Sequence, residues 1–201
     1  MSGVELGPLI GTAGARLVKV AHGVGEHGLS AVTPCEAYDA RGLLNHLLYW
    51  GPILERAARK APIPDDRPAE GEVDLTANDW QTVLAAQVDG VASAWADPAA
   101  WEGTTSVGQS ALGDLPASLV GSIVLMEFVI HGWDLARATG QPFEADDKAV
   151  EAVREYLALT VEHGRTLGAF GPEVPVSADA PILHRTLGVS GRDPGWSVAA
   201  S

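Results

Sequence analysis

Residues 116–140 of the chain read PASLVGSIVLMEFVIHGWDLARATG. Nearly every residue from Leu119 to Ile130 is apolar, so a helix over this segment is expected to be buried on almost all sides. The run is shorter than the roughly 20 apolar residues of a membrane span, and Glu127 interrupts it. Gly140 has the position of a glycine that ends a helix. The stretch therefore predicts the buried central helix of an all-α fold, over residues 116–139.

Other segments carry apolar residues at three- and four-residue steps, the period of an amphipathic helix. These segments cover residues 8–22, 30–60, 77–96 and 145–167, with a short helix over 181–187. In the second segment, the sequence Thr33-Pro34-Cys35-Glu36 has the pattern of a helix-starting capping box, and Pro52 is expected to kink or divide the helix. The expected fold is a four-helix bundle over residues 1–168. A short C-terminal tail, residues 169–201, packs on the bundle and is not a separate domain.

Composition excludes several classes of partner. The 201 residues include 13 Lys and Arg against 26 Asp and Glu, a net charge of −13. A nucleic-acid-binding protein needs a basic face, and an anionic membrane surface attracts basic segments, so neither partner is expected. The single cysteine, Cys35, excludes an internal disulfide and a cysteine zinc finger. The N-terminus lacks the pattern of a secretory signal, and we expect a cytoplasmic protein.

The central helix carries two side chains suited to a metal ion. Glu127 and His131 are four residues apart, so they lie one turn apart on the same face. An ionised carboxylate buried without a partner costs several kcal/mol or takes up a proton, and a divalent cation shared with the imidazole would compensate it. His46, in the leucine-rich segment LLNHLL, is the best candidate for a third ligand. Asp134 is expected to orient the ring of His131 from the second shell of the site.

Each of these residues also has a structural interpretation. Glu127 would also be compensated by a buried arginine, and His46 would also fit an ordinary core histidine bonded to a carbonyl group. Asp134 would pair with Arg137 on a solvated helix face. Cys35, at an expected helix start, has either a lowered pKa or the role of a small buried apolar residue.

The segment EFVIHGWDLARATG, residues 127–140, resembles the signature helix of the mycothiol-dependent maleylpyruvate isomerase family, which belongs to the DinB/YfiT-like metalloenzyme superfamily. Thr33–Cys35 and Leu43–Leu47 match the second helix of that family. The tail over Leu183–Trp196, with its GRDP motif, is similar to the ending of a metal-binding subgroup. The resemblance covers nearly the whole chain. It implies a DinB-like four-helix bundle that binds one divalent metal ion, usually Zn²⁺ and sometimes Ni²⁺, through His46, Glu127 and His131.

The resemblance also implies a chemistry. In the characterised isomerases the open metal position receives the thiol of mycothiol, and the thiolate adds to an electrophile. The expected function is thus that of a metal-dependent isomerase or S-transferase with a thiol and a small-molecule electrophile as partners. The isomerases carry a further C-terminal domain in place of the short tail, so maleylpyruvate itself is not the expected substrate. Homodimers are common in the superfamily.

Two other functions stay open at this point. The first is a non-catalytic bundle that binds a metal ion or a small molecule, and the second is a structural metal closed by a fourth protein ligand. Substrate specificity is expected to lie in the loop over residues 97–113 and in the tail. Three arginines, Arg67, Arg185 and Arg192, lie in loops or in the tail, and the sequence places none of them at the site.

Overall fold

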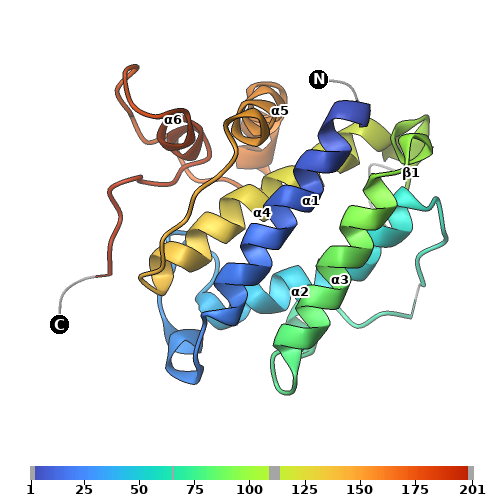
Figure 1. Cartoon of the computed structure of the whole chain (residues 1–201), viewed down its shortest axis with the longest axis horizontal. Helices are drawn as coiled ribbons and strands as arrows, with labels where there is room; N and C mark the ends of the chain where they lie inside the picture. Colours follow the sequence, from blue (N-terminus) through green and yellow to red (C-terminus); the bar gives the residue numbers. More distant parts are fainter. Residues whose placement is uncertain (1–2, 65, 109–113, 199–201) are drawn as a thin grey trace.

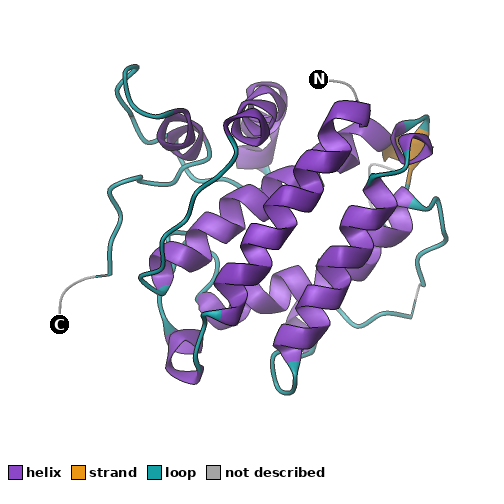
Figure 2. Cartoon of the chain, in the orientation of Figure 1, coloured by secondary structure: helices purple, strands orange, loops and turns teal. Residues whose placement is uncertain are grey.

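The computed structural model describes residues 3–64, 66–108 and 114–198. It is mostly helical (Figure 2), and its helices are α1 (Gly3–His22), α2 (Ala40–Ala58), α3 (Trp80–Trp95), α4 (Ala117–Ala138), α5 (Asp147–Thr166) and α6 (Ile182–Val189). Short 3-10 turns cover Glu26–Ser30, Glu70–Glu72 and Pro98–Trp101. Two strands of two residues, β1 (Thr104–Thr105) and β2 (Leu115–Pro116), pair antiparallel.

The first four helices form the bundle. Helices α1 and α2 each pack against both α3 and α4, while α5 packs on α4 and α6 packs on α5 (Figure 1). The all-α bundle with a short C-terminal helix is therefore confirmed, and the ends of α3 to α6 lie within about three residues of the predicted ends.

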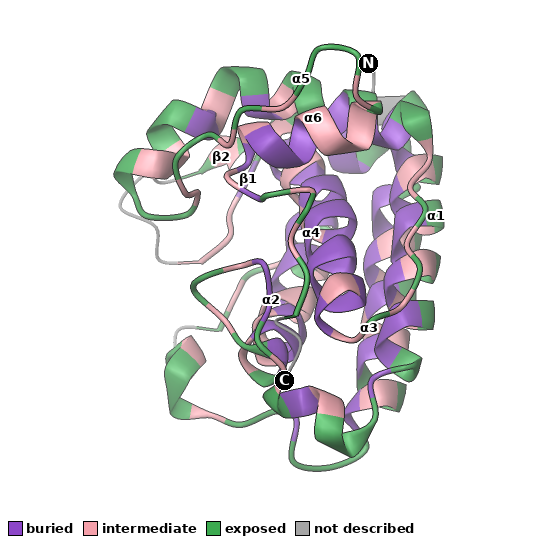
Figure 3. Ribbon diagram, turned by 90° about the vertical axis from the view of Figure 1, so that its left-hand side faces the viewer, coloured by how far each residue is buried: buried purple, intermediate pink, exposed green. Residues whose placement is uncertain are grey.

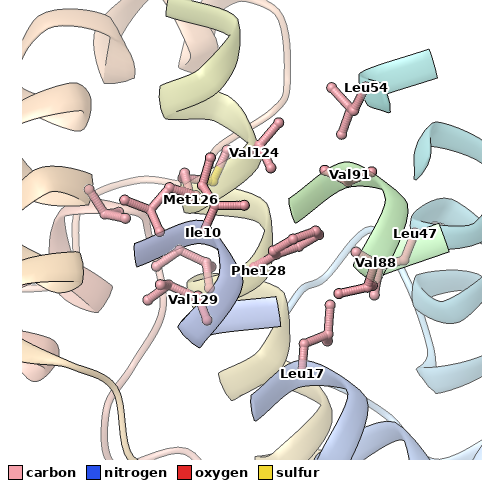
Figure 4. Packing of buried hydrophobic residues seen from close by; sticks show 14 of the residues in the cluster. Ile10, Leu17, Leu47, Leu54, Val88, Val91, Val124, Met126, Phe128 and Val129 are labelled. Atoms are coloured by element: carbon pink, nitrogen blue, oxygen red, sulfur yellow. The ribbon is translucent and has the colours of Figure 1, made fainter. Parts of the chain in front are cut away.

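Helix α4 is the centre of the core. It is long and apolar enough to cross a membrane by length and composition, but 78% of its most apolar window is buried inside the protein. Figure 3 shows this helix mostly in the colour of buried residues. Phe128 of α4 lies near Leu17 of α1 and Val88 of α3 (Figure 4). A Cβ atom on Gly14 would lie 2.6 Å from Val88 Cγ1 and 3.2 Å from the Phe128 ring, so a glycine is needed for this close approach of α1. Such burial is typical of the core helix of a soluble protein.

The predicted helix start at Thr33 is wrong. Residues 31–39 lie outside any helix, and Thr33 closes a turn, because its hydroxyl accepts a hydrogen bond from the Cys35 N–H (3.1 Å) and donates to the Tyr38 carbonyl (2.6 Å). The helix begins at Ala40, where the Asp39 carboxylate accepts from the Gly42 N–H at 2.7 Å. Asp39 is thus the N-cap residue, and Cys35 lies in the preceding loop.

Two helices differ from the prediction at their prolines. Helix α2 runs unbroken through Pro52, so the predicted division of this helix is wrong. The lost backbone hydrogen bond is offset there by the burial of Leu48, Ile53 and Leu54 on the same helix. Helix α1 contains Pro8 and begins at Gly3, earlier than the predicted start.

Hydrogen bonds hold the C-terminal tail against α5, and a close backbone contact joins two segments of the tail. Arg165 of α5 donates to the carbonyls of Gly171 (3.0 Å) and Val189 (2.7 Å). Gly191 has a φ of +83° and approaches the backbone of Gly171 so closely that a Cβ atom would lie 2.9 Å from it. These contacts place Arg192, the next residue, against the bundle.

Candidate metal centre

The side chains of His46, Glu127 and His131 converge at one point between α2 and α4. The Oε2 atom of Glu127 lies 3.1 Å from His46 Nε2 and 3.2 Å from His131 Nε2. One ligand atom from each of the three residues lies within 4.8 Å of the other two. The structure therefore brings together the three residues that the sequence predicted as metal ligands.

A carboxylate forms a hydrogen bond with the Nδ1 atom of each imidazole ring, the nitrogen that faces away from Glu127. His131 Nδ1 lies 2.9 Å from Asp134 Oδ2, and His46 Nδ1 lies 2.8 Å from Glu70 Oε1. A carboxylate accepts a hydrogen bond, so each Nδ1 carries a proton. Both Nε2 atoms consequently face Glu127, in the arrangement by which proteins orient metal-binding histidines. The predicted contact of Asp134 with His131 is present, whereas sequence analysis missed Glu70.

Glu70 is held in turn by two aromatic residues. Trp50 Nε1 donates to Glu70 Oε2 at 2.9 Å, and the Tyr38 hydroxyl donates to Glu70 Oε1 at 3.1 Å. Glu70 belongs to a 3-10 turn in the long connection between α2 and α3. Sequence analysis could not find Glu70, because this residue lies in an irregular loop without helical periodicity. It comes close to His46 only in the tertiary structure.

Asp134 is fully buried and forms an ion pair with Arg192 of the tail. Arg192 Nη2 donates to Asp134 Oδ2 at 3.1 Å, and Arg192 Nη1 donates to the Ser190 carbonyl at 3.0 Å. The alternative interpretation of Asp134, a surface pair with Arg137, is wrong, because Arg137 donates to the Trp196 carbonyl instead. Of the three arginines that the sequence left unplaced, Arg192 is the one that lines the cavity beside the three converging side chains.

The cluster favours positive charge. Burial lowers the pKa of His46, but its hydrogen bonds to Glu127 and Glu70 outweigh burial and raise this pKa to about 9. Burial also lowers the pKa of His131. The negative charge of Glu127 and the hydrogen bond to Asp134 outweigh burial, so the pKa of His131 is raised as well. The pKa of Glu127 is held below its ordinary value, because the charge of His131 overcomes the effect of burial.

The donor set fits a divalent cation. When both rings are neutral, His46 Nε2, His131 Nε2 and Glu127 Oε2 are all acceptors, so the point where they meet needs a positive charge. Two zinc bonds of about 2.0–2.1 Å at a tetrahedral angle separate their donor atoms by about 3.3 Å. The distances of 3.1 and 3.2 Å from Glu127 Oε2 to the two nitrogens are close to that value.

A cavity of about 180 Å³ borders the cluster. It is lined by the three converging residues and, among others, by Cys35, Phe170 and Arg192. The half-buried Cys35 is not at a helix start, and burial raises the pKa of its thiol although the charge of Arg192 acts in the opposite direction. The lowered pKa that a helix start would give is therefore not observed.

Cys35, His131 and Asp134 also bring ligand atoms within 4.8 Å of one another. This second grouping is a poor cation site, because the Asp134 carboxylate already pairs with the Arg192 guanidinium, whose charge repels a metal ion.

Comparison with known proteins identifies the family. The family model described as mycothiol maleylpyruvate isomerase N-terminal domain matches residues 10–136, a range that contains all three converging residues. Two uncharacterized proteins of Mycobacterium tuberculosis, from strains CDC 1551 / Oshkosh and ATCC 25618 / H37Rv, are each 26% identical over 166 residues, which cover 82% of this chain and 85% of each relative. No solved structure matches significantly. The chain belongs to the mycothiol maleylpyruvate isomerase N-terminal domain family, a mycothiol-related, DinB-like family.

Proposed function

We propose that this protein is a divalent-metal-dependent enzyme that adds a small thiol, of the mycothiol kind, to an electrophile. His46, Glu127 and His131 would hold one metal ion, Zn²⁺ or alternatively Ni²⁺. The observation that carries the proposal is the convergence of two Nε2 atoms on one carboxylate oxygen, with a further carboxylate behind each ring. A bound divalent cation supplies a Lewis acid that lowers the pKa of a thiol or water ligand.

The chain's own residues prepare the site for this chemistry. Asp134 and Glu70 fix the tautomers of the two histidines, so that no ring has to rotate when the ligands bind the ion. Three protein donors leave room in a tetrahedral shell for one exchangeable ligand, as catalytic zinc sites require. The cavity of about 180 Å³ lies against these donors and offers the space for that ligand.

Arg192 suits this cavity to an electrophile that carries negative charge. Two of its five N–H groups point at Asp134 and one at the Ser190 carbonyl, so the guanidinium has donor capacity left. Because the Arg192 side chain is only 6% exposed, a carboxylate of the electrophile would gain more from this charge than it would in solvent.

Thiol binding tests the proposal directly. Cobalt(II) would replace the native metal, and mycothiol would be titrated while the thiolate-to-cobalt charge-transfer band is recorded. The band is expected in the wild type and not in Glu127→Gln, while His163→Ala, which changes an exposed histidine of α5, should match the wild type. A second assay uses zinc-loaded protein and follows either the consumption of mycothiol by monobromobimane or the disappearance of maleylpyruvate in the presence of mycothiol, which isomerisation would not consume.

These assays separate the functions. Metal binding with a thiol band but no turnover of any electrophile would favour a non-catalytic metal-binding bundle. Metal binding without any exchangeable ligand would favour a structural metal site, and either result would contradict the enzymatic proposal.

A further inference from the structure

One face of α2 continues beyond the metal centre. His46, Tyr49, Trp50 and Ile53 follow one another at the spacing of a single helix stripe. The connection between α2 and α3, described over residues 61–64 and 66–72, lies against this stripe, because Glu70 contacts His46 and Trp50, and the Tyr49 hydroxyl donates to the Pro68 carbonyl at 3.1 Å. The same connection that orients His46 therefore also covers the next turns of α2.

A second cavity, of about 270 Å³, lies between this stripe and the connection. None of its lining residues lines the cavity at the metal centre. Its apolar walls come from Trp50 and Ile53 on α2, from Ile63 on the connection, and from Val107 in the segment after β1. Its volume is near the lower end of small-molecule sites, at roughly 300 Å³.

A fixed positive charge lies in the wall of this cavity. The guanidinium carbon of Arg67 lies 4.4 Å from the centre of the Tyr49 ring, and Arg67 Nη2 donates to the Tyr49 carbonyl at 2.8 Å. A cation stacked on an aromatic ring is held in place and is only partly neutralised. Among the residues that the structure describes, no carboxylate forms an ion pair with Arg67.

The chain has twice as many acidic as basic residues, but some of its arginines, among them Arg56, Arg137 and Arg185, bond to backbone carbonyls as Arg67 does. Four other arginines pair with carboxylates, in the ion pairs Arg41–Asp74, Arg59–Glu55, Arg165–Glu162 and Arg192–Asp134. Arg67 instead keeps most of its five N–H donors for another acceptor. A guanidinium fork binds a carboxylate through two parallel hydrogen bonds, and the flat apolar walls suit a ring or a short apolar chain attached to it.

We propose that this cavity binds a small carboxylate with an aromatic or apolar body, whose negative charge pairs with Arg67. The body packs against Trp50, Ile53 and Val107. The ligand then touches the indole whose Nε1–H holds Glu70, the residue that orients His46. The site is distinct from the metal centre, and the inference does not depend on metal binding.

Benzoate and its neutral isostere benzamide are suitable probes. Binding would be followed by nuclear magnetic resonance, through the assigned Trp50 indole and Arg67 Nε–H signals of the full chain. We expect benzoate to shift both signals at millimolar concentration, and benzamide to bind about tenfold more weakly, because it lacks the charge that pairs with Arg67.

Four variants locate the site. Arg67→Gln is expected to weaken benzoate binding about tenfold and to remove its advantage over benzamide, whereas Arg154→Gln, which removes one exposed charge from α5, should leave binding unchanged. Val107→Phe would fill the cavity and block both probes without changing any charge. Glu127→Gln should bind benzoate as the wild type does.

The inference is overturned by any of four results. These are no shift of either signal, equal affinity for the two probes, benzoate binding that Arg67→Gln leaves unchanged, or benzoate binding that is lost in Glu127→Gln. The last result would place the carboxylate at the metal centre instead.

Discussion

Replacing Asp134 by asparagine should affect both the stability of the fold and the orientation of His131 in the proposed metal site. Asp134 is fully buried and accepts from both His131 Nδ1 at 2.9 Å and Arg192 Nη2 at 3.1 Å. The side chain of Arg192 is only 6% exposed, so Asp134→Asn leaves a buried guanidinium without its counter-charge. Breaking a buried pair in this way costs about 3–5 kcal/mol of unfolding free energy.

The same change should weaken zinc binding. An amide holds the His131 ring less firmly than a carboxylate does, and loss of such a partner lowers metal affinity by about 10–100-fold, which equals about 1.4–2.7 kcal/mol. Unfolding free energy would be measured by urea denaturation of chelator-treated protein. Zinc affinity would be measured by competition with a chromophoric chelator.

A double variant distinguishes the two effects. Asp134→Leu combined with Arg192→Met removes both charges, and replacing a whole buried ion pair by apolar residues is often neutral or stabilising. We expect the unfolding free energy to return to within about 2 kcal/mol of the wild type, while zinc affinity stays about 10–100-fold lower, because His131 Nδ1 still lacks its acceptor. Glu55→Gln, which breaks a surface ion pair with Arg59, should cost less than about 1 kcal/mol.

Two results would refute this reasoning. If Asp134→Asn binds zinc as tightly as the wild type, the carboxylate does not orient His131 for a metal ion. If the single variant loses no more stability than Glu55→Gln, the buried ion pair does not have the cost assigned to it.

Three further predictions concern pH, the second carboxylate and the packing of glycines. In chelator-treated protein the raised pKa of His46, about 9, stabilises the fold by up to about 3 kcal/mol relative to an unfolded pKa near 6.5. This stabilisation is complete below about pH 6.5 and is lost as the pH rises through 9, so urea denaturation should show a fall in stability that His46→Gln reduces, with His131, whose pKa is also raised, contributing the rest. Glu70→Gln should weaken zinc binding about tenfold in the competition assay with a smaller loss of stability than Asp134→Asn, because Glu70 is partly exposed. Gly188→Ala should lower the unfolding free energy by about 1–3 kcal/mol, because its Cβ would lie 2.5 Å from the Val174 carbonyl oxygen. Gly11→Ala, with open space around its Cβ, should raise the unfolding free energy by about 0.5–1 kcal/mol.

Each of these predictions has a contrary outcome. Stability of chelator-treated protein that is flat between pH 6.5 and 9 would mean that His46 does not carry a raised pKa. If Glu70→Gln leaves zinc affinity unchanged, Glu70 does not orient His46 for metal binding. Equal stability of Gly188→Ala and Gly11→Ala would mean that Gly188 does not pack closely against the Val174 carbonyl.

Local patterns predicted the part of the site that lies on regular helices. Glu127 and His131 are one turn apart on α4, so helix geometry alone places them together. His46 was found because a histidine among leucines in an amphipathic segment is expected to face the core. Their convergence also required the packing of α2 on α4, and the family resemblance supported the pairing of these helices without specifying distances.

The missed residues reach the site from irregular segments. Glu70 lies in a connection without periodicity, and Arg192 is 58 residues beyond Asp134 in the chain. Their positions depend on how the connection and the tail dock, which a single sequence does not specify. The GRDP motif around Arg192 was the one available signal. The wrong helix start at Thr33 also depends on a local ambiguity, because a threonine side chain closes a turn as readily as it caps a helix. Asp39 caps α2 instead, by accepting from the Gly42 N–H.

The central claim is that His46, Glu127 and His131 bind one cation, and its most direct test is a crystal of the zinc-loaded protein measured at the zinc absorption edge. We predict one anomalous peak per chain at this cluster, within about 2.0–2.2 Å of His46 Nε2, His131 Nε2 and a Glu127 carboxylate oxygen. No peak at this point, or a peak bound by other residues with these three side chains turned away from it, would contradict the claim.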